Sequence, residues 1–94
     1  MSYSSKKDFE KLKKNLKKHQ IWPSEYVFKF IISNEKKKKE ELLSKFDLTK
    51  YKFLSKESSN KKYISLTLMK VMNNPDEVVS KYIDVSNIDG IISL

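Results

Sequence analysis

With 94 residues the chain is long enough for one small domain, and its lack of cysteine excludes disulfides, thiolate chemistry and cysteine-ligated zinc or iron–sulfur sites. Its net charge of +8 rests on lysine, because the sequence contains no arginine, the residue preferred for bidentate recognition of phosphate or guanine. No apolar run approaches the ~20 residues of a membrane helix and no secretory signal is evident, so we expect a cytoplasmic protein without membrane contact.

The N-terminal part predicts a polar tail and a basic amphipathic helix. Residues 1–7 are polar, and after them Phe9, Leu12 and Leu16 recur at helical spacing among lysines. Such a helix can lie on an anionic membrane. Three apolar residues give little area for that, so we expect the helix to pack on the edge of the domain, with Trp22 seating it.

Three strand-like runs follow, and their alternation predicts which side chains face inward. In the first, Tyr26–Ile32, Phe28 and Phe30 are expected to lie in the core while Lys29 points to water. The turn at 58–60 joins the other two runs into a hairpin. These two runs are Lys50–Ser55, with Tyr51 and Phe53 on one side, and Lys62–Met72, with Ile64, Leu66 and Leu68 facing inward.

Two further helices are predicted between and after these strands. Ser33 or Asn34 is expected to cap the first, which opens on a lysine run at 36–39. The second has a complete start signal, with Asn74 as the N-cap, Pro75 at the first helical position and Glu77 closing a capping box. The buried stripes are expected to be Leu42, Leu43 and Phe46 in the first helix, and Val78, Val79, Tyr82, Ile83 and Val85 or Ile88 in the second.

The order of these signals is β-α-β-β-α-β, which predicts an α+β sandwich with two helices against one face of a four-stranded antiparallel sheet. The last strand is expected at Gly90–Leu94, where the only glycine either ends the preceding helix or turns the chain into the strand. We divide the chain into residues 1–21, the tail and N-terminal helix, and residues 22–94, the sandwich domain.

Four segments carry a resemblance to a known family, and they are Trp22–Ile31, Lys62–Ser65, Val71–Met72 and Ile88–Leu94. They resemble the YbeD-like family of small bacterial proteins of unknown function. The family is ferredoxin-like and similar to the ACT regulatory domains that bind small molecules in metabolic enzymes. The resemblance implies a ferredoxin-like fold, and it implies no activity or ligand.

The residues predict no enzyme, no cofactor and no metal site. Acylphosphatase chemistry on this fold needs an arginine, metal-chaperone relatives use paired cysteines, and no glycine-rich phosphate loop is present. His19 has no acidic partner nearby in sequence, so a surface role is expected rather than general-base catalysis. Cap and surface roles are likewise expected for the carboxylates of Asp76, Glu77 and Asp84.

RNA-recognition modules share this layout and stack bases on outward aromatic side chains of the central strands. Here Lys29, Ser65 and Thr67 occupy the outward positions, and Tyr63 is the only aromatic residue among them. If the faces were exchanged, Lys29 would be buried without an evident partner, which is costly. We therefore expect any nucleic-acid contact to be weak, nonspecific and driven by lysine.

The outward sheet face is our candidate binding site, although an antiparallel face can simply be solvated. The expected partner is another protein, with a small metabolite as a second possibility. Amino-acid-binding ACT domains have a glycine-bearing turn after the first strand, and this chain has Ser33, Asn34 and Glu35 there. We expect a non-catalytic regulatory or scaffolding domain, monomeric or weakly dimeric, with a site formed by Lys29, Lys52, Tyr63, Ser65 and Thr67.

Overall fold

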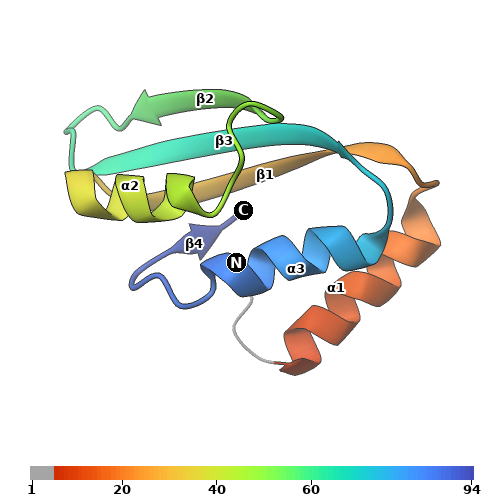
Figure 1. Cartoon of the computed structure of the whole chain (residues 1–94). Helices are drawn as coiled ribbons and strands as arrows, with labels where there is room; N and C mark the ends of the chain where they lie inside the picture. Colours follow the sequence, from red (N-terminus) through yellow and green to blue (C-terminus); the bar gives the residue numbers. More distant parts are fainter. Residues whose placement is uncertain (1–5) are drawn as a thin grey trace.

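The computed structural model describes residues 6–94 and contains three helices and four strands (Figure 1). The expected tail falls partly outside this range, because residues 1–5 are not among those described, whereas residues 6 and 7 already belong to the first helix. In chain order the elements are α1 (Lys6–His19), β1 (Ser24–Ser33), α2 (Lys36–Ser44), β2 (Lys52–Glu57), β3 (Tyr63–Met72), α3 (Pro75–Val85) and β4 (Ile92–Ser93).

The four strands form one antiparallel sheet in the order β2-β3-β1-β4. The central strands β1 and β3 pair over ten residues, from Ser24 opposite Met72 to Ser33 opposite Tyr63. The edge strand β4 is much shorter and pairs only with Phe30 and Ile31 of β1. This α+β arrangement is compatible with a ferredoxin-like fold.

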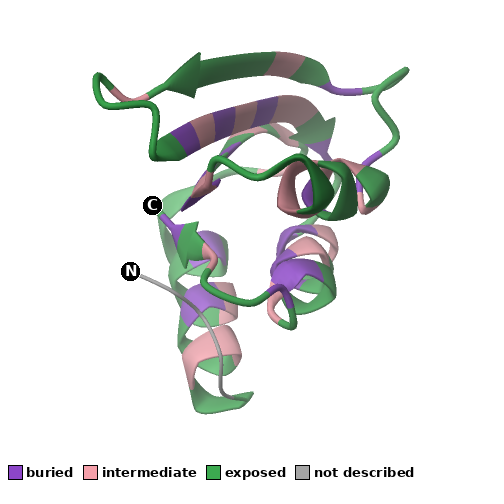
Figure 2. Ribbon diagram, turned by 90° about the vertical axis from the view of Figure 1, so that its left-hand side faces the viewer, coloured by how far each residue is buried: buried purple, intermediate pink, exposed green. Residues whose placement is uncertain are grey.

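The helices lie on one side of the sheet and leave its other face uncovered (Figure 2). Phe28 and Phe30 have no exposed surface, whereas Lys29 between them is exposed, so the predicted orientation of β1 is confirmed. The same alternation along β3 buries Ile64, Leu66 and Leu68. The core therefore fills the space between the inward sheet face and the helices.

The N-terminal helix α1 packs beside α3. Leu12 and Leu16 are buried in the same cluster as the strand side chains. The indole Nε1 of Trp22 donates a hydrogen bond to the carbonyl oxygen of Leu16 at 3.1 Å, so Trp22 does seat the helix as expected. The apolar side of α1 is thus used inside the protein. No helix within residues 6–94 combines the length and apolar character that crossing a bilayer requires.

The predicted cap of α2 is wrong. Glu35 is the N-cap residue, and its side chain makes no capping bond. Ser33 and Asn34 do not cap the helix, because their side chains have other partners. The Ser33 hydroxyl donates to the Glu35 carboxylate at 2.6 Å, and the Asn34 amide donates to the Lys61 carbonyl at 3.0 Å. The Ser33 hydrogen bond and then the charge of Lys38 lower the pKa of Glu35.

The predicted N-cap of α3 at Asn74 and the proline at the first helical position are confirmed. The Asn74 side chain accepts a hydrogen bond from the Glu77 backbone N–H at 3.0 Å. The Glu77 carboxylate accepts one at 2.9 Å from the N–H of Asn73, one residue before the N-cap, so the predicted capping box is not closed on Asn74 itself. The buried stripe was predicted correctly except for Ile83, which is 50% exposed. Ile83 points away from the sheet, toward a hollow between α1 and α3 that Phe9 and Val79 also line.

The chain ends in a turn and a short strand. The helix α3 ends at Val85, and Gly90 follows with a positive φ of 74°, so this glycine turns the chain into β4 rather than ending the helix. The strand β4 covers two residues instead of the expected five. The strand β2 covers Lys52–Glu57, two residues later than the predicted Lys50–Ser55, and Tyr51 lies buried just before it.

Candidate functional site

The uncovered face of the sheet, called the open face below, consists of the outward side chains of all four strands. Their alternation follows from the strand pairing, which places outward residues opposite outward residues. They are Glu25, Val27, Lys29, Ile31 and Ser33 of β1, Lys52, Leu54 and Lys56 of β2, Tyr63, Ser65, Thr67, Met69 and Val71 of β3, Ile92 of β4, and Leu94.

All five predicted site residues lie on the open face, but they do not converge on one point. Lys29 and Thr67 are cross-strand partners at its centre. Lys52 lies at the β2 edge, opposite Met69. Tyr63 lies at the far end of β3, four residues from Thr67 and therefore about 13 Å away. The arrangement is a broad surface rather than a pocket.

The sequence prediction missed how apolar this surface is. Among residues 6–94, nine large hydrophobic side chains are exposed, and three of them, Ile21, Leu48 and Ile83, lie elsewhere. The other six lie on the open face: Val27, Leu54, Tyr63, Val71, Ile92 and Leu94. The alternation of β1 already placed Val27 and Ile31 beside Lys29, so part of this signal was present in the sequence.

The charged side chains of the open face are mostly lysines. Lys29, Lys52 and Lys56 lie on it, and among residues 6–94 Glu25 is the only carboxylate side chain on it. The ion pairs found within residues 6–94 are Lys13–Asp76, Lys38–Glu35 and Lys81–Asp84. None of the three lysines of the open face therefore pairs with a carboxylate of the described part of the chain.

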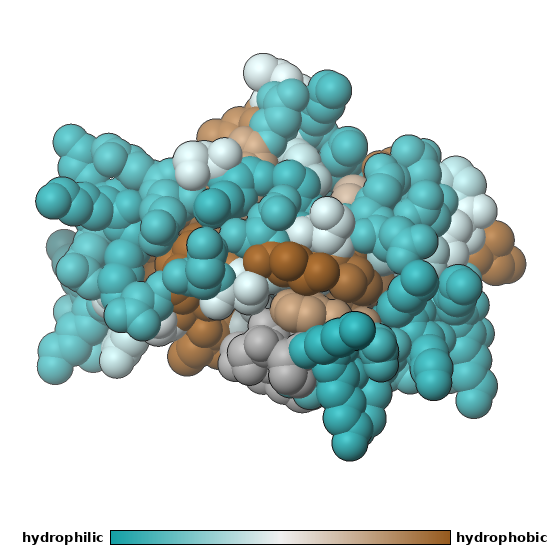
Figure 3. All heavy atoms as spheres, turned by 60° about the horizontal axis from the view of Figure 1, so that its bottom comes forward, coloured by the Kyte–Doolittle hydropathy of each residue, from teal (hydrophilic) through white to brown (hydrophobic). Residues whose placement is uncertain are grey.

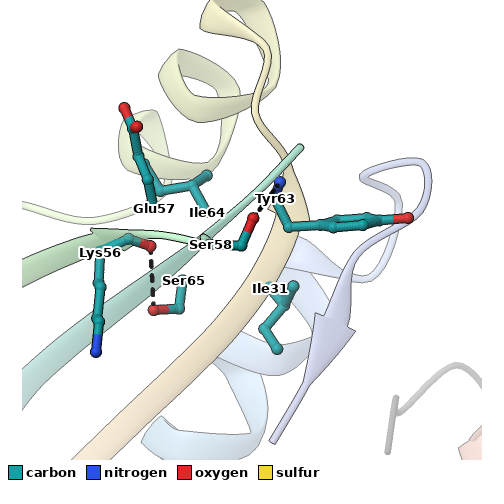
Figure 4. Close-up of a pocket in the computed structure, with 7 residues that line it drawn as sticks. All are labelled: Ile31, Lys56, Glu57, Ser58, Tyr63, Ile64 and Ser65. Atoms are coloured by element: carbon teal, nitrogen blue, oxygen red, sulfur yellow. Dashed lines mark hydrogen bonds between the residues drawn. The ribbon is translucent and has the colours of Figure 1, made fainter. Parts of the chain in front are cut away.

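A small hollow of about 190 Å³ lies at the hairpin end of the open face. Figure 4 shows Ile31, Tyr63 and Ser65 on one side of it, while Glu57 and Ile64 point the other way. The Ser65 hydroxyl is already directed to the Lys56 carbonyl, at 3.4 Å. The hollow is smaller than the ~300–1,000 Å³ of typical small-molecule sites. It therefore gives little support to a metabolite site.

A second hollow, of about 490 Å³, lies where β3 meets the start of α3. Tyr51, Lys70, Glu77 and Lys81 line it, and the Lys70 ammonium lies 5.5 Å from the centre of the Tyr51 ring. Burial, and then the nearby Glu77 carboxylate, raise the pKa of Tyr51. These groups provide hydrogen bonds and charges, but no nucleophile with an adjacent base.

The carboxylates considered from the sequence lie in cap and surface positions, as expected. Asp76 pairs with Lys13 at 2.7 Å, Asp84 pairs with Lys81 at 3.7 Å, and Glu77 accepts the hydrogen bond at the start of α3. His19 is exposed at the end of α1. Within residues 6–94, no three histidine or carboxylate side chains are grouped closely enough to hold a metal ion.

Comparison with known proteins identifies no relative of this chain. No protein-family model matches it, and no curated protein or solved structure matches it either. Its function is therefore inferred from the open face and the other surfaces described above.

Proposed function

We propose that this protein is a non-catalytic regulatory or scaffolding domain that docks a protein partner on the open face of its sheet. The observation that carries this proposal is the concentration of exposed apolar side chains on that face. Leu54 is 62% exposed and Val71 is 56% exposed, although neither is needed to fill the core. A concentration of exposed apolar side chains on one face is typical of an interaction surface.

The size of the open face suits a transient partner. Its central strands are ten residues long, about 33 Å, and the four strands span about 14 Å, so the face covers on the order of 500 Å². A standard stable interface buries about 800 Å² on each partner, so the open face fits the smaller class of transient contacts. A regulatory module has this kind of interface.

The fold assignment is part of the same proposal. We assign the domain to the ferredoxin-like class and, from the four segments described above, to the YbeD-like family, and we place it in the cytoplasm. The element order and the strand order β2-β3-β1-β4 support the fold class. The covered Phe28 and Phe30 support a protein partner over stacked RNA bases, because neither ring reaches the open face.

Affinity capture with two matched variants tests the proposal. The open-face variant carries Leu54→Ser and Val71→Ser, and the control carries Ile83→Ser on α3, which removes an apolar side chain that is 50% exposed. We expect a protein captured by the wild type and the control to be lost from the open-face variant. Capture that all three retain, or that only the control loses, would contradict docking on the open face. Circular dichroism confirms that each variant is folded.

A second candidate function is weak binding of nucleic acid through α1. Lys7, Lys11, Lys14 and Lys18 are exposed and recur every three or four residues, so they form one stripe about 16 Å long. Four phosphate contacts predict that the logarithm of the affinity falls with the logarithm of salt concentration with a slope of about −3 to −4. Absence of retention on duplex DNA at low salt would eliminate this candidate.

A further inference from the structure

We infer that the partner of the open face is an acidic amphipathic segment of another protein, whose apolar side chains pack on the face and whose carboxylates bind Lys29, Lys52 and Lys56. This inference rests on the proposed function, and it adds the chemistry of the partner. Its basis is the arrangement of charges within the apolar surface, which the strand register defines residue by residue.

The open face consists of rows that run across the strands. The central row contains Lys29, and apolar residues lie in the rows on both sides of it. From β4 to β2, the central row is Leu94, Lys29, Thr67 and Leu54, the row toward the hairpin is Ile92, Ile31, Ser65 and Lys56, and the row on the other side is Val27, Met69 and Lys52.

The three lysines form a triangle that a single segment can span. Lys52 and Lys56 are four residues apart on the edge strand β2, about 13 Å along it. Lys29 lies two strands away, about 10 Å across the sheet. A helix about 10–12 Å wide, laid on the face, therefore reaches all three ammonium groups while its apolar side covers the rows between them.

These lysines favour an acidic partner because their charges are not neutralised within residues 6–94. When a partner covers the open face, the lysine ammonium groups lose contact with water, which is costly unless the partner supplies carboxylates that pair with them. Glu25, the only side-chain carboxylate that residues 6–94 place on this face, lies at the start of β1 opposite Val71. The surface therefore presents Lys29 at its centre and Lys52 and Lys56 at its β2 edge, with apolar side chains such as Leu54 and Met69 between them.

The same arrangement argues against a second copy of this chain as the occupant. A symmetric dimer pairs the same surface patch on both subunits. A dimer through the open face therefore brings six lysines, three from each copy, into one interface in which residues 6–94 supply side-chain carboxylates only from the two Glu25 residues, so like charges repel. The face is therefore suited to a partner of opposite charge.

The groove between α1 and α3 provides an internal contrast. It also exposes apolar side chains, among them Ile83, and it has a volume of about 420 Å³. Seen from this side, the surface is mostly hydrophilic with a hydrophobic strip in its middle (Figure 3). Of its two lysines, Lys13 binds Asp76 at 2.7 Å, and Lys6 forms no ion pair within residues 6–94. The groove also contains the carboxylates of Glu10 and Asp76, so its charges balance, whereas the three lysines of the open face share that face with the single side-chain carboxylate of Glu25 among residues 6–94.

Selection from a phage library of random 16-residue peptides tests the chemistry of the partner. The full chain is the target, and the Leu54→Ser, Val71→Ser variant serves for counter-selection. We expect peptides that bind the wild type but not the variant to combine apolar residues with a clear excess of Asp and Glu. If such face-dependent peptides are neutral or basic, the inference fails while docking on the face stands. If no peptide depends on the face, both fail.

The lysines are tested with the tightest acidic peptide from that selection. We expect Lys29→Gln, Lys52→Gln and Lys56→Gln each to raise its Kd by about 2- to 5-fold at low salt, as for partly exposed ion pairs. Lys14→Gln on the exposed side of α1 removes the same charge elsewhere and should leave Kd unchanged. An equal rise in Kd for all four variants would show a nonspecific charge effect and overturn the inference. A wild-type dimer in analytical ultracentrifugation that Leu54→Ser converts to a monomer would also overturn it.

Discussion

The two faces of one sheet differ in what their side chains contribute. On the covered face, Phe28, Phe30 and Leu66 have no exposed surface and pack beneath the helices. On the open face, which no helix covers, lie exposed apolar side chains such as Val27 of β1 and Leu54 of β2. Because both sets come from the same strands, the contrast separates residues that stabilise the fold from residues whose apolar surface is left for a partner.

The largest expected effect comes from truncating one side chain on each face of β1. Phe28→Ala should lower the free energy of unfolding by about 3–5 kcal/mol, because the ring is fully buried and is surrounded by other aromatic rings. Val27→Ala should cost less than about 1 kcal/mol. Urea denaturation monitored by circular dichroism measures both, and Phe28→Leu replaces the alanine variant if the latter does not fold. Similar losses at the two positions would contradict the contrast between the faces.

The starts of α2 and α3 give the next largest difference in stability, because only α3 has a side-chain capping bond. Asn74→Ala removes the side chain that accepts the Glu77 N–H, so it should lower stability by about 0.5–2 kcal/mol. Glu35→Ala removes an N-cap side chain that makes no capping bond, so its effect should be clearly smaller. Chemical denaturation of both variants compares them directly. A larger loss from Glu35→Ala would show that the start of α2 is misassigned.

A smaller change in the free energy of unfolding is expected from a substitution in the hairpin that joins β2 and β3. Lys61 has a positive φ of 60°, a conformation that glycine adopts more easily than a residue with a side chain. Lys61→Gly should therefore raise the free energy of unfolding by up to about 1 kcal/mol. Lys62→Gly, one residue later, provides the control and should be destabilising. A loss of stability from Lys61→Gly would contradict the assigned turn.

The smallest expected effect is a change in stability at high pH. Burial raises the pKa of Tyr51 in the folded protein above its ordinary value near 10, so the folded state favours the neutral phenol. The contribution of neutral Tyr51 to the free energy of unfolding is present in full below pH ~10 and is lost as the pH rises through the folded-state pKa. Tyr51→Phe should therefore lose less stability than the wild type between pH ~9 and ~11. If the stability of the wild type and of Tyr51→Phe depends on pH in the same way, the raised pKa of Tyr51 is contradicted.

The sequence predicted the long elements better than the short ones. The alternation in β1 and β3 extends over many residues, so it placed Phe28 inward and Lys29 outward, and the start of α3 followed from adjacent Asn74 and Pro75. The strand β4 has only two residues, too few for an alternating pattern to show which side chains point outward. Ile92 and Leu94 were therefore not assigned to the open face. The cap of α2 depended on a long-range bond from Asn34 to Lys61 that no local pattern contains.

Thiol labelling along β3 tests most directly whether the sheet has one covered and one open face. The natural chain has no cysteine, so single cysteines at Leu66, Thr67, Leu68 and Met69 can each be labelled without background. We predict fast labelling at 67 and 69, and labelling at 66 and 68 slower by at least about 100-fold, because it requires local or global opening. Equal rates at the four positions, or the opposite alternation, would contradict the two-faced sheet and with it the docking surface.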